Sequence, residues 1–275
     1  MAGTLHLVGT PIGNLGDVSR RAKETLARVD LVAAEDTRRA RKLLSHLGVR
    51  AELATLFEGN ERARTETLLD ALRDGRDVAV ISDAGMPGLS DPGYRLVRAC
   101  AEEGIDVRVV PGPSAAIAAL VVSGLPSDRF VFEGFLPKKE GERRARLEAL
   151  ATERRTIVLF ESPRRVGATL EVIASILGPD RPVSVARELT KVHEEVLRGT
   201  AEELARATGA VELRGEVVLV IGGATEGPAP ELSQLVDEAV ELIRSGWKKR
   251  EAAAEVARRH EVSTNAIYRA LLEER

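Results

Sequence analysis

Short apolar runs alternate with helical patterns along the first 122 residues, and this alternation constrains the fold more than any other feature. These runs, in which His6, Thr55 and Arg108 are the polar exceptions, lie at residues 5–8, 31–34, 53–56, 78–81 and 107–110. Strands that are buried on both faces are short and continuously apolar, and a helix between them returns the chain so that neighbouring strands run parallel. The sequence therefore predicts an α/β domain with a parallel sheet and helices on both faces.

The longest connecting loop follows the fourth predicted strand. It reads SDAGMPGLSDPG at residues 82–93, with three glycines and two prolines. This composition suits a rigid loop whose backbone approaches a ligand closely. We expect Asp91 to cap the next helix and Pro92 to occupy its first position. An ordinary connection with one capping aspartate is the alternative interpretation.

Two further Gly/Pro-rich loops follow the first and fifth predicted strands. They read GTPIGNLGD at residues 9–17 and PGPSA at residues 111–115. The first is not a dinucleotide fingerprint, because its glycines are spaced GxxxGxxG, and it lacks the Gly-Lys-Ser/Thr of a Walker loop. Since parallel strands end at one edge of a sheet, we expect all three loops to lie there, where open α/β sheets bind ligands.

The pattern changes near residue 123, which we take as a domain boundary. Further strands are expected at residues 130–132, 156–160, 183–187 and 217–221, with an edge strand at 194–198. A Gly/Pro-rich linker at residues 222–230 ends this second unit.

Three short helical patterns follow the linker and resemble a helix-turn-helix core. They lie at residues 231–245, 249–260 and 263–272. The sequence thus predicts two α/β domains, at residues 1–123 and 124–225, and a linker with a helical extension at residues 226–275.

Composition argues against several classes of protein. Aromatic residues make up only 3% of the chain, so multi-ring stacking platforms for RNA are not expected. A net charge of −3 argues against indiscriminate coating of nucleic acid but is compatible with a local basic surface. The single cysteine, Cys100, rules out a disulfide framework, and the four histidines lack metal-ligand spacing. Without a signal pattern or an apolar stretch of about 20 residues, we expect a cytoplasmic protein with no membrane segment.

Six short motifs, taken in order, resemble the tetrapyrrole-methylase superfamily. They are GTPIGNL at residues 9–15, AEDTR at 34–38, the loop at 82–93, PGPSA at 111–115, ESPR at 161–164 and ARELTK at 186–191. More narrowly, they are similar to the ribosomal branch of that superfamily, the 16S rRNA cytidine 2′-O-methyltransferases. The resemblance covers residues 1–223, and the C-terminal helices resemble the extension of the same branch. Met86 and Arg164 depart from the pattern, since Thr and His are expected there.

The resemblance implies two α/β domains with S-adenosylmethionine in the cleft between them, usually in a homodimer. It also implies methyl transfer to a cytidine 2′-oxygen in 16S rRNA, in the decoding region of the small ribosomal subunit. The expected cofactor-binding residues of the first domain are Thr10, Pro11, Asp83, Ala84, Gly85, Met86, Pro87, Ser114 and Ala115. The resemblance adds Phe160, Ala186 and Leu219 from the second domain.

The chemistry requires an aligned oxygen and an acceptor for one proton, because a sulfonium methyl group is already activated. Glu35 and Asp36 follow a strand at the same edge and are one candidate pair, although Asp36 could equally cap its helix. The rival cluster is Arg187, Glu188 and Lys191. Its cations could hold a phosphate or lower the pKa of the hydroxyl group. A surface ion-pair group is the alternative for this cluster, and Arg164 leaves any His-dependent step without its histidine.

RNA must be held by local basic surfaces, since the whole chain is slightly acidic. The candidates are Arg38, Arg39, Arg41, Lys42, Lys138, Lys139, Arg164, Lys248, Lys249 and Arg250. Each group is also compatible with an ordinary solvated face. Together they predict an interrupted track of phosphate contacts.

Two other functions remain open at this point. One is a small-molecule corrinoid or porphyrinogen C-methylase, against which the EDTR motif at residues 35–38 and the helical extension argue. The other is a helix-turn-helix regulator whose α/β part senses a ligand and whose residues 231–275 bind duplex DNA.

Overall fold

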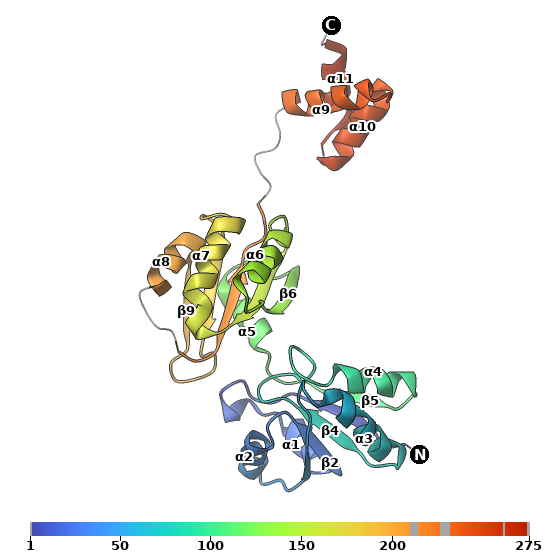
Figure 1. Cartoon of the computed structure of the whole chain (residues 1–275), viewed down its shortest axis with the longest axis vertical. Coiled ribbons are helices and arrows are strands. Elements are labelled where there is room, and N and C mark those ends of the chain that lie inside the picture. The colour runs from blue at the N-terminus through green and yellow to red at the C-terminus, as the bar shows by residue number, and fades with distance from the viewer. Residues whose placement is uncertain (1, 210–213, 226–231, 261, 274–275) are drawn as a thin grey trace. The chain divides into compact units, whose positions relative to one another are not determined.

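The computed structural model describes residues 2–209, 214–225, 232–260 and 262–273 (Figure 1). Its contacts divide the chain into two units, Met1–Ala224 and Thr225–Arg275. The larger unit contains two five-stranded sheets, and the smaller unit is helical. This is the predicted fold class, two α/β halves and a helical extension.

The first sheet has the strand order β3-β2-β4-β1-β5. Its strands are β1 (Leu5–Val8), β2 (Leu31–Ala34), β3 (Glu52–Thr55), β4 (Val78–Ile81) and β5 (Val107–Val110). All neighbouring pairs are parallel, which confirms the prediction. Because β2, β4, β1 and β5 are consecutive in the sheet, the loops that follow them leave one edge side by side.

Helices cover both faces of this sheet, as Figure 1 shows. One face packs against α1 (Arg20–Leu26) and α2 (Thr37–Leu47), and the other against α3 (Glu61–Arg73) and α4 (Tyr94–Glu102). Alternate residues of each strand supply the two cores, so that β1 contributes Val8 to the first and Leu5 to the second. The central strands β2 and β4 are therefore apolar throughout, because neither of their faces meets water.

The start of α4 differs from the prediction, which was wrong about Asp91. The N-cap residue is Gly93, with a φ of 128° and no side-chain cap. A carboxylate oxygen of Glu61, at the start of α3, instead accepts hydrogen bonds from the backbone N–H groups of Gly93 (2.9 Å) and Arg95 (3.2 Å). This buried carboxylate satisfies donors that a helix start leaves unpaired.

The second sheet has the order β6-β7-β10-β8-β9. Its strands are β6 (Phe130–Phe135), β7 (Thr156–Glu161), β8 (Pro182–Arg187), β9 (Glu195–Thr200) and β10 (Val217–Ile221). Only β6 and β7 are parallel, and β10 runs antiparallel to both of its neighbours. The predicted edge strand at residues 194–198 is confirmed as β9, which pairs with β8 alone.

One face of the second sheet packs against α6 (Glu140–Ala149), α7 (Val166–Leu177) and α8 (Ala201–Gly209). The other face packs against α5 (Ala115–Ser123), whose Ala119 and Leu120 lie in one core with Val158 and Val220. The sequence placed this helix in the first domain. Its packing places it on the second sheet. Burial of apolar surface stabilises a helix against either sheet, so its sequence alone does not decide which one it covers.

The smaller unit consists of α9 (Leu232–Arg244), α10 (Lys249–Arg259) and α11 (Thr264–Glu273). Leu235, Val256 and Ile267, one from each helix, are buried together in its core. The three predicted helices are thereby confirmed. Among the helices that the structure describes, none has the length and apolarity needed to cross a bilayer.

Candidate functional site

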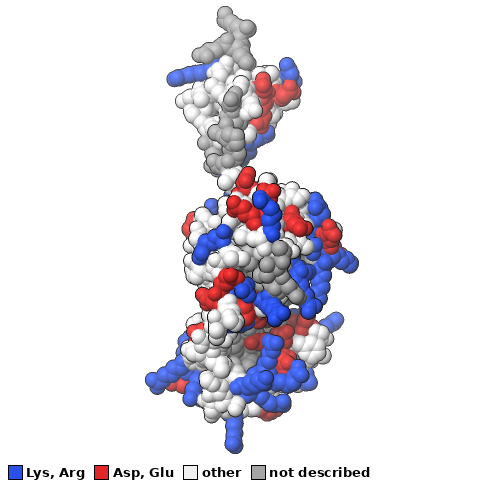
Figure 2. Space-filling view, turned by 90° about the vertical axis from the view of Figure 1, so that its left-hand side faces the viewer, with Lys and Arg blue, Asp and Glu red and all other residues white. Residues whose placement is uncertain are grey.

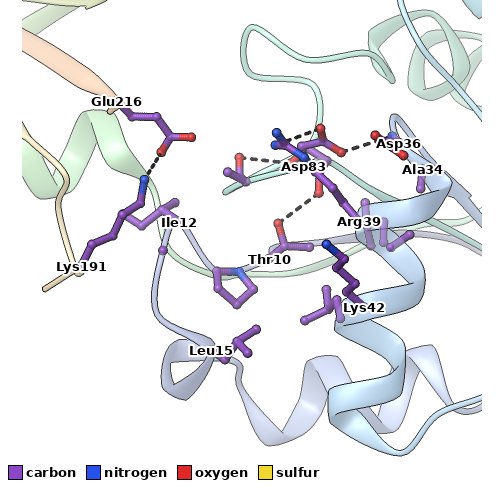
Figure 3. Close-up of a pocket in the computed structure, with 17 residues that line it drawn as sticks. Thr10, Ile12, Leu15, Ala34, Asp36, Arg39, Lys42, Asp83, Lys191 and Glu216 are labelled. Atoms are coloured by element: carbon purple, nitrogen blue, oxygen red, sulfur yellow. Dashed lines mark hydrogen bonds and ion pairs between the residues drawn. The ribbon is translucent and has the colours of Figure 1, made fainter. Parts of the chain in front are cut away.

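A cavity of about 260 Å³ opens where the strands of the first sheet end (Figure 3). Its walls come from the loop after β1, the end of β2 with the start of α2, and the loop after β4. The second half of the larger unit contributes Lys191 and Glu216, which Figure 3 shows on the side opposite Asp83 and Arg39. The cavity therefore lies at the edge predicted for ligand binding.

Backbone hydrogen bonds hold the loops after β1 and β4 together. The N–H of Thr10 donates to the carbonyl of Gly85 (2.8 Å), and the N–H of Gly85 donates back to Thr10 (3.2 Å). The buried hydroxyl of Thr10 lies 3.2 Å from the carbonyl oxygen of Ser82. Gly85 has a φ of 84°, which a residue with a side chain rarely adopts. This part of the wall is thus fixed before any ligand binds.

The loops after β1 and β5 approach so closely that only glycine fits. A Cβ atom on Gly9 would lie 2.6 Å from the Cα of Gly112, and 2.7 Å from the sulfur of Met86. The backbone N–H of Gly9 also donates to the carbonyl of Val110 (2.9 Å). The three Gly/Pro-rich loops therefore converge at one edge, as the sequence predicted.

Asp36 caps α2 and belongs to an ion pair. One of its oxygens accepts a hydrogen bond from the backbone N–H of Arg38 (2.8 Å), and the other lies 2.8 Å from the Arg38 guanidinium. The side-chain and backbone hydrogen bonds from Arg38 hold the pKa of Asp36 well below its ordinary value. A carboxylate held ionised in this way is a weak base, so the capping interpretation describes its main contacts.

Three other carboxylates lie near this cap. Asp83 accepts from the backbone N–H of Asp36 (3.2 Å) and pairs with Arg39 (3.2 Å). Burial, followed by the charge of Asp83, raises the pKa of Glu35. Burial, followed by the charge of Glu35, raises the pKa of Asp91 to about 6, although a hydrogen bond from Ser82 opposes the shift. Glu35 and Asp91 thus bind a proton more readily than Asp36 does.

The opposite wall carries one ammonium group. The Nζ atom of Lys191 lies 2.8 Å from a carboxylate oxygen of Glu188 and 3.1 Å from one of Glu216. Burial acts to lower the pKa of Lys191, but the hydrogen bonds to these two carboxylates outweigh it and raise that pKa. Lys191 therefore acts in the cavity as a cation and not as a base.

The turn that positions Lys191 is strained and contacts the first half of the unit. Glu188 and Thr190 have φ values of 50° and 67°, which are uncommon for residues with side chains and most costly for a β-branched one. A Cβ atom on Gly13 would lie 2.5 Å from the Cγ of Lys191 and 3.0 Å from the Thr190 hydroxyl. Such strain at a point of contact is typical of a functional turn.

Thr190 also has a buried hydroxyl oxygen without a hydrogen-bond partner among the described residues. The residue lines a second, more open cavity of about 540 Å³ together with Ser114, Ile12 and Pro113. A buried polar atom without a partner is uncommon in a folded protein. A polar group of a ligand in the second cavity could form the hydrogen bond that this oxygen lacks.

The predicted cofactor-binding residues of the first domain lie at these two cavities or support them. Thr10, Pro11, Asp83 and Ala84 line the first cavity, and Ser114 lines the second. The remaining four, Gly85, Met86, Pro87 and Ala115, continue the same two loops, and Gly85 and Pro87 are buried.

The three residues expected from the second domain lie deeper. Phe160 is partly buried and packs edge-on against Phe132, with ring centroids 5.1 Å apart. Ala186 and Leu219 are fully buried, and Leu219 lies in the core beneath α7. None of the three is among the described residues that line either cavity.

The predicted RNA-binding residues differ in their partners. Arg38 and Arg39 pair with carboxylates of the cavity, Lys139 pairs with Glu142, and the ammonium of Lys249 donates to the carbonyl of Leu271. The exposed residues without an ion pair in the described part of the chain are Arg41, Lys42, Lys138, Arg164, Lys248 and Arg250. Figure 2 shows basic and acidic side chains interspersed on one face, in keeping with the near-neutral charge.

One predicted residue, Arg187, and one motif, ESPR, have structural explanations. Arg187 pairs with Glu195 at 2.5 Å and does not line the first cavity. In the ESPR motif, Glu161 is 2% exposed and accepts hydrogen bonds from Arg165 (2.7 Å) and Thr169 (2.8 Å). The motif thus joins β7 to α7, through a 3₁₀ turn at Pro163–Arg165, and its buried carboxylate was not singled out from the sequence.

Comparison with known proteins identifies a family model and several named proteins that this chain resembles. Residues 4–205 match the family model described as Tetrapyrrole (Corrin/Porphyrin) Methylases. Proteins named ribosomal RNA small subunit methyltransferase I are similar over nearly their whole length. The one from Mycobacterium tuberculosis (strain CDC 1551 / Oshkosh) is 49% identical and covers 100% of this chain and 96% of that protein. The one from Synechocystis sp. (strain ATCC 27184 / PCC 6803 / Kazusa) is 46% identical and covers 98% of each.

Solved structures share the two-sheet architecture. A uroporphyrin-III-C-methyltransferase from Thermus thermophilus has a TM-score of 0.59 and 25% identity, covering 81% of this chain and 95% of that one. A uroporphyrin-III C-methyltransferase from the same organism, complexed with S-adenyl homocysteine, has a TM-score of 0.57 and 20% identity over 80% of this chain and 97% of that one.

Proposed function

Because the chain belongs to the tetrapyrrole (corrin/porphyrin) methylase family, we propose that it transfers a methyl group from S-adenosylmethionine to a cytidine 2′-oxygen of 16S rRNA. The observation that carries this proposal is the 43–49% identity to proteins named ribosomal RNA small subunit methyltransferase I over nearly the full chain. The uroporphyrin enzyme covers 81% of the chain at 25% identity, which favours RNA over a tetrapyrrole substrate.

The two cavities fit the cofactor in their chemistry. S-adenosylmethionine, when bound, supplies a methyl group on a positively charged sulfur. The apolar side chains of Ile12 and Ala84 suit its nucleoside and aliphatic parts, and the Ser114 and Thr190 hydroxyls suit its polar groups. The buried Thr190 oxygen, which has no protein partner in the described chain, supports this fit.

Residues at or next to the first cavity are assigned the other tasks of the reaction, which are proton acceptance, orientation and stabilisation of negative charge. We assign the proton of the 2′-hydroxyl to Glu35, which lies in the chain between the lining residues Ala34 and Asp36 and whose pKa burial raises above its ordinary value. Asp36 orients Arg38 and the start of α2. Lys191 remains protonated and stabilises negative charge that develops on the ribose oxygen or lies on a neighbouring phosphate.

We also propose that the protein acts as a homodimer in the cytoplasm, where ribosomal subunits are its substrate. Ile117 and Val121, one turn apart on α5, are exposed, and Val109 on the edge strand β5 is exposed as well. Exposed apolar side chains in consecutive elements are typical of a protein interface. Sedimentation of wild-type protein and of Val121→Lys distinguishes a dimer that depends on this face from a monomer.

The test of the activity is methyl transfer from labelled S-adenosylmethionine to three substrates. Small ribosomal subunits, free 16S rRNA and uroporphyrinogen III are compared under the same conditions. We expect label on RNA, at one cytidine whose 3′ phosphodiester bond becomes resistant to alkali because its 2′-oxygen is blocked. Label on the tetrapyrrole with none on either RNA substrate would overturn the proposal.

A further inference from the structure

A third concave surface, separate from the two cavities, lies on the first half between the C-terminal part of α2 and β3. It is a groove of about 580 Å³. Arg41, Leu44 and Ser45 form the side that belongs to α2, and residues 48–51 and 53 form the other side. Among the described residues, two arginines line the groove and no Asp or Glu does. Its charge therefore differs from that of the first cavity, where three carboxylates offset three cations.

Both arginines of the groove are free to bind an anion. Arg41 and Arg50 are exposed, and neither forms an ion pair with a described residue. On the same helix, Arg38 and Arg39 are neutralised by Asp36 and Asp83. A guanidinium without a carboxylate partner keeps its planar set of donors for a phosphate group.

The groove is close to the first cavity because α2 lines both. Arg39 and Lys42 face the cavity, as Figure 3 shows, whereas Arg41 and Ser45 face the groove. From Arg39 to Ser45 the helix rises by about 9 Å. A polymer bound in the cavity can therefore reach the groove by crossing a single helix.

The shape of the groove favours a chain over a small anion. β3 is the edge strand of its sheet, so the groove is not closed by a further strand. Leu44 and Val49 are buried, so the exposed lining is mainly the two guanidinium groups and the Ser45 hydroxyl. Such a surface offers donors for a phosphate and no apolar slot for a base.

We propose that this groove binds a backbone phosphate of the RNA next to the methylated nucleotide, held by Arg41 and Arg50. The proposal rests on the proposed function and extends it to a residue, Arg50, outside the predicted basic surfaces. It accounts for RNA binding by a slightly acidic protein, because two unpaired guanidinium groups create a local positive field.

The experiment reverses these charges in the full-length protein. Arg41→Glu and Arg50→Glu should each weaken binding to small ribosomal subunits about tenfold at 0.1 M salt, and each should reduce the salt slope by about one. Arg50→Gln, which removes the charge without adding repulsion, should reduce the slope by the same amount. Calorimetry with S-adenosylmethionine should give wild-type affinity for every variant, which shows that the site still folds.

Arg64→Glu is the matched control. Arg64 is an exposed arginine of α3, which covers the opposite face of the same sheet, and it has no ion pair in the described chain. Its reversal should leave affinity and salt slope unchanged. Equal weakening by Arg64→Glu, or wild-type RNA binding by both Arg41→Glu and Arg50→Glu, would overturn the groove proposal. A wild-type protein that methylates no RNA would instead overturn the proposed function.

Discussion

A methyl group added at position 13 should slow methyl transfer by moving Lys191 out of its place in the cavity. The Cβ atom of Gly13→Ala would lie 2.5 Å from the Cγ and 2.8 Å from the Cε of Lys191. Gly13 does not have a positive φ, so the backbone accepts alanine without strain. The substitution therefore acts through the contact with the second half and not through the conformation of its own loop.

The size of the effect follows from these distances. Non-bonded carbon atoms are most stable at about 3.5–4.0 Å, so Lys191 must move by about 1 Å. That movement weakens its ion pairs with Glu188 and Glu216, whose side chains are 20% and 64% exposed, against 27% for Lys191. Pairs this exposed contribute at most about 1 kcal/mol each. Weakening both without breaking them costs about 1 kcal/mol in total, so the melting temperature should fall by only about 2–4 °C. A displacement of about 1 Å at a catalytic site can reduce the rate up to about 10²-fold.

A double-mutant cycle separates this mechanism from a general disturbance. The kcat/KM for methylation of small ribosomal subunits is measured for Gly13→Ala, Lys191→Ala and the double variant. If the added methyl group acts only by displacing Lys191, the double variant should be no slower than Lys191→Ala. Gly16→Ala is the control, because its Cβ would contact only Asn14 of the same exposed turn. Independent, additive losses of activity would refute the reasoning.

Three further substitutions test stability. Glu161→Ala removes a buried carboxylate and leaves its half-buried partner Arg165 unpaired. Urea denaturation should therefore show a loss of about 3–5 kcal/mol in the free energy of unfolding, against less than about 0.5 kcal/mol for Glu24→Ala in an exposed helix pair. Asp91→Asn should stabilise the protein at pH 8 by about 1 kcal/mol but not at pH 4. The raised pKa of Asp91, about 6, favours the folded state at low pH. Wild-type protein loses this stabilisation as the pH rises through about 6. Melting curves at pH 4 and pH 8 measure the difference. Gly141→Ala, in α6 with no atom within 4 Å of the added Cβ, should raise the free energy of unfolding by about 0.5–1 kcal/mol.

The first sheet and its converging loops could be predicted because the information is local. The central strands β2 and β4 are apolar runs of four residues, and the rule that parallel strands end at one edge brings residues 9–17, 82–93 and 111–115 together. The position of α5 could not be predicted in the same way. A helix that is apolar around most of its circumference shows no preferred face, so its sequence does not indicate which of two sheets it covers.

The contacts that build the site depend on partners far apart in the chain. Glu61 caps a helix that begins at Tyr94, and Lys191 packs against Gly13. Neither pair has a spacing that a local motif could reveal. The sequence did identify Asp36 as a possible helix cap, because that function depends only on the next two residues.

The distribution of charge along α2 follows from the two ligands that the proposed reaction brings together. A sulfonium donor is positively charged and RNA is negatively charged. A single basic surface would therefore attract the RNA and repel the donor. In the cavity, carboxylates such as Asp83 offset the guanidinium of Arg39, which leaves the donor in a nearly neutral field. In the groove, Arg41 and Arg50 have no such partners in the described chain. Added salt should therefore weaken RNA binding steeply and leave the affinity for S-adenosylmethionine almost unchanged, because only the first depends on unpaired surface charge. Equal salt dependence of the two affinities, measured by calorimetry and filter binding, would contradict this separation.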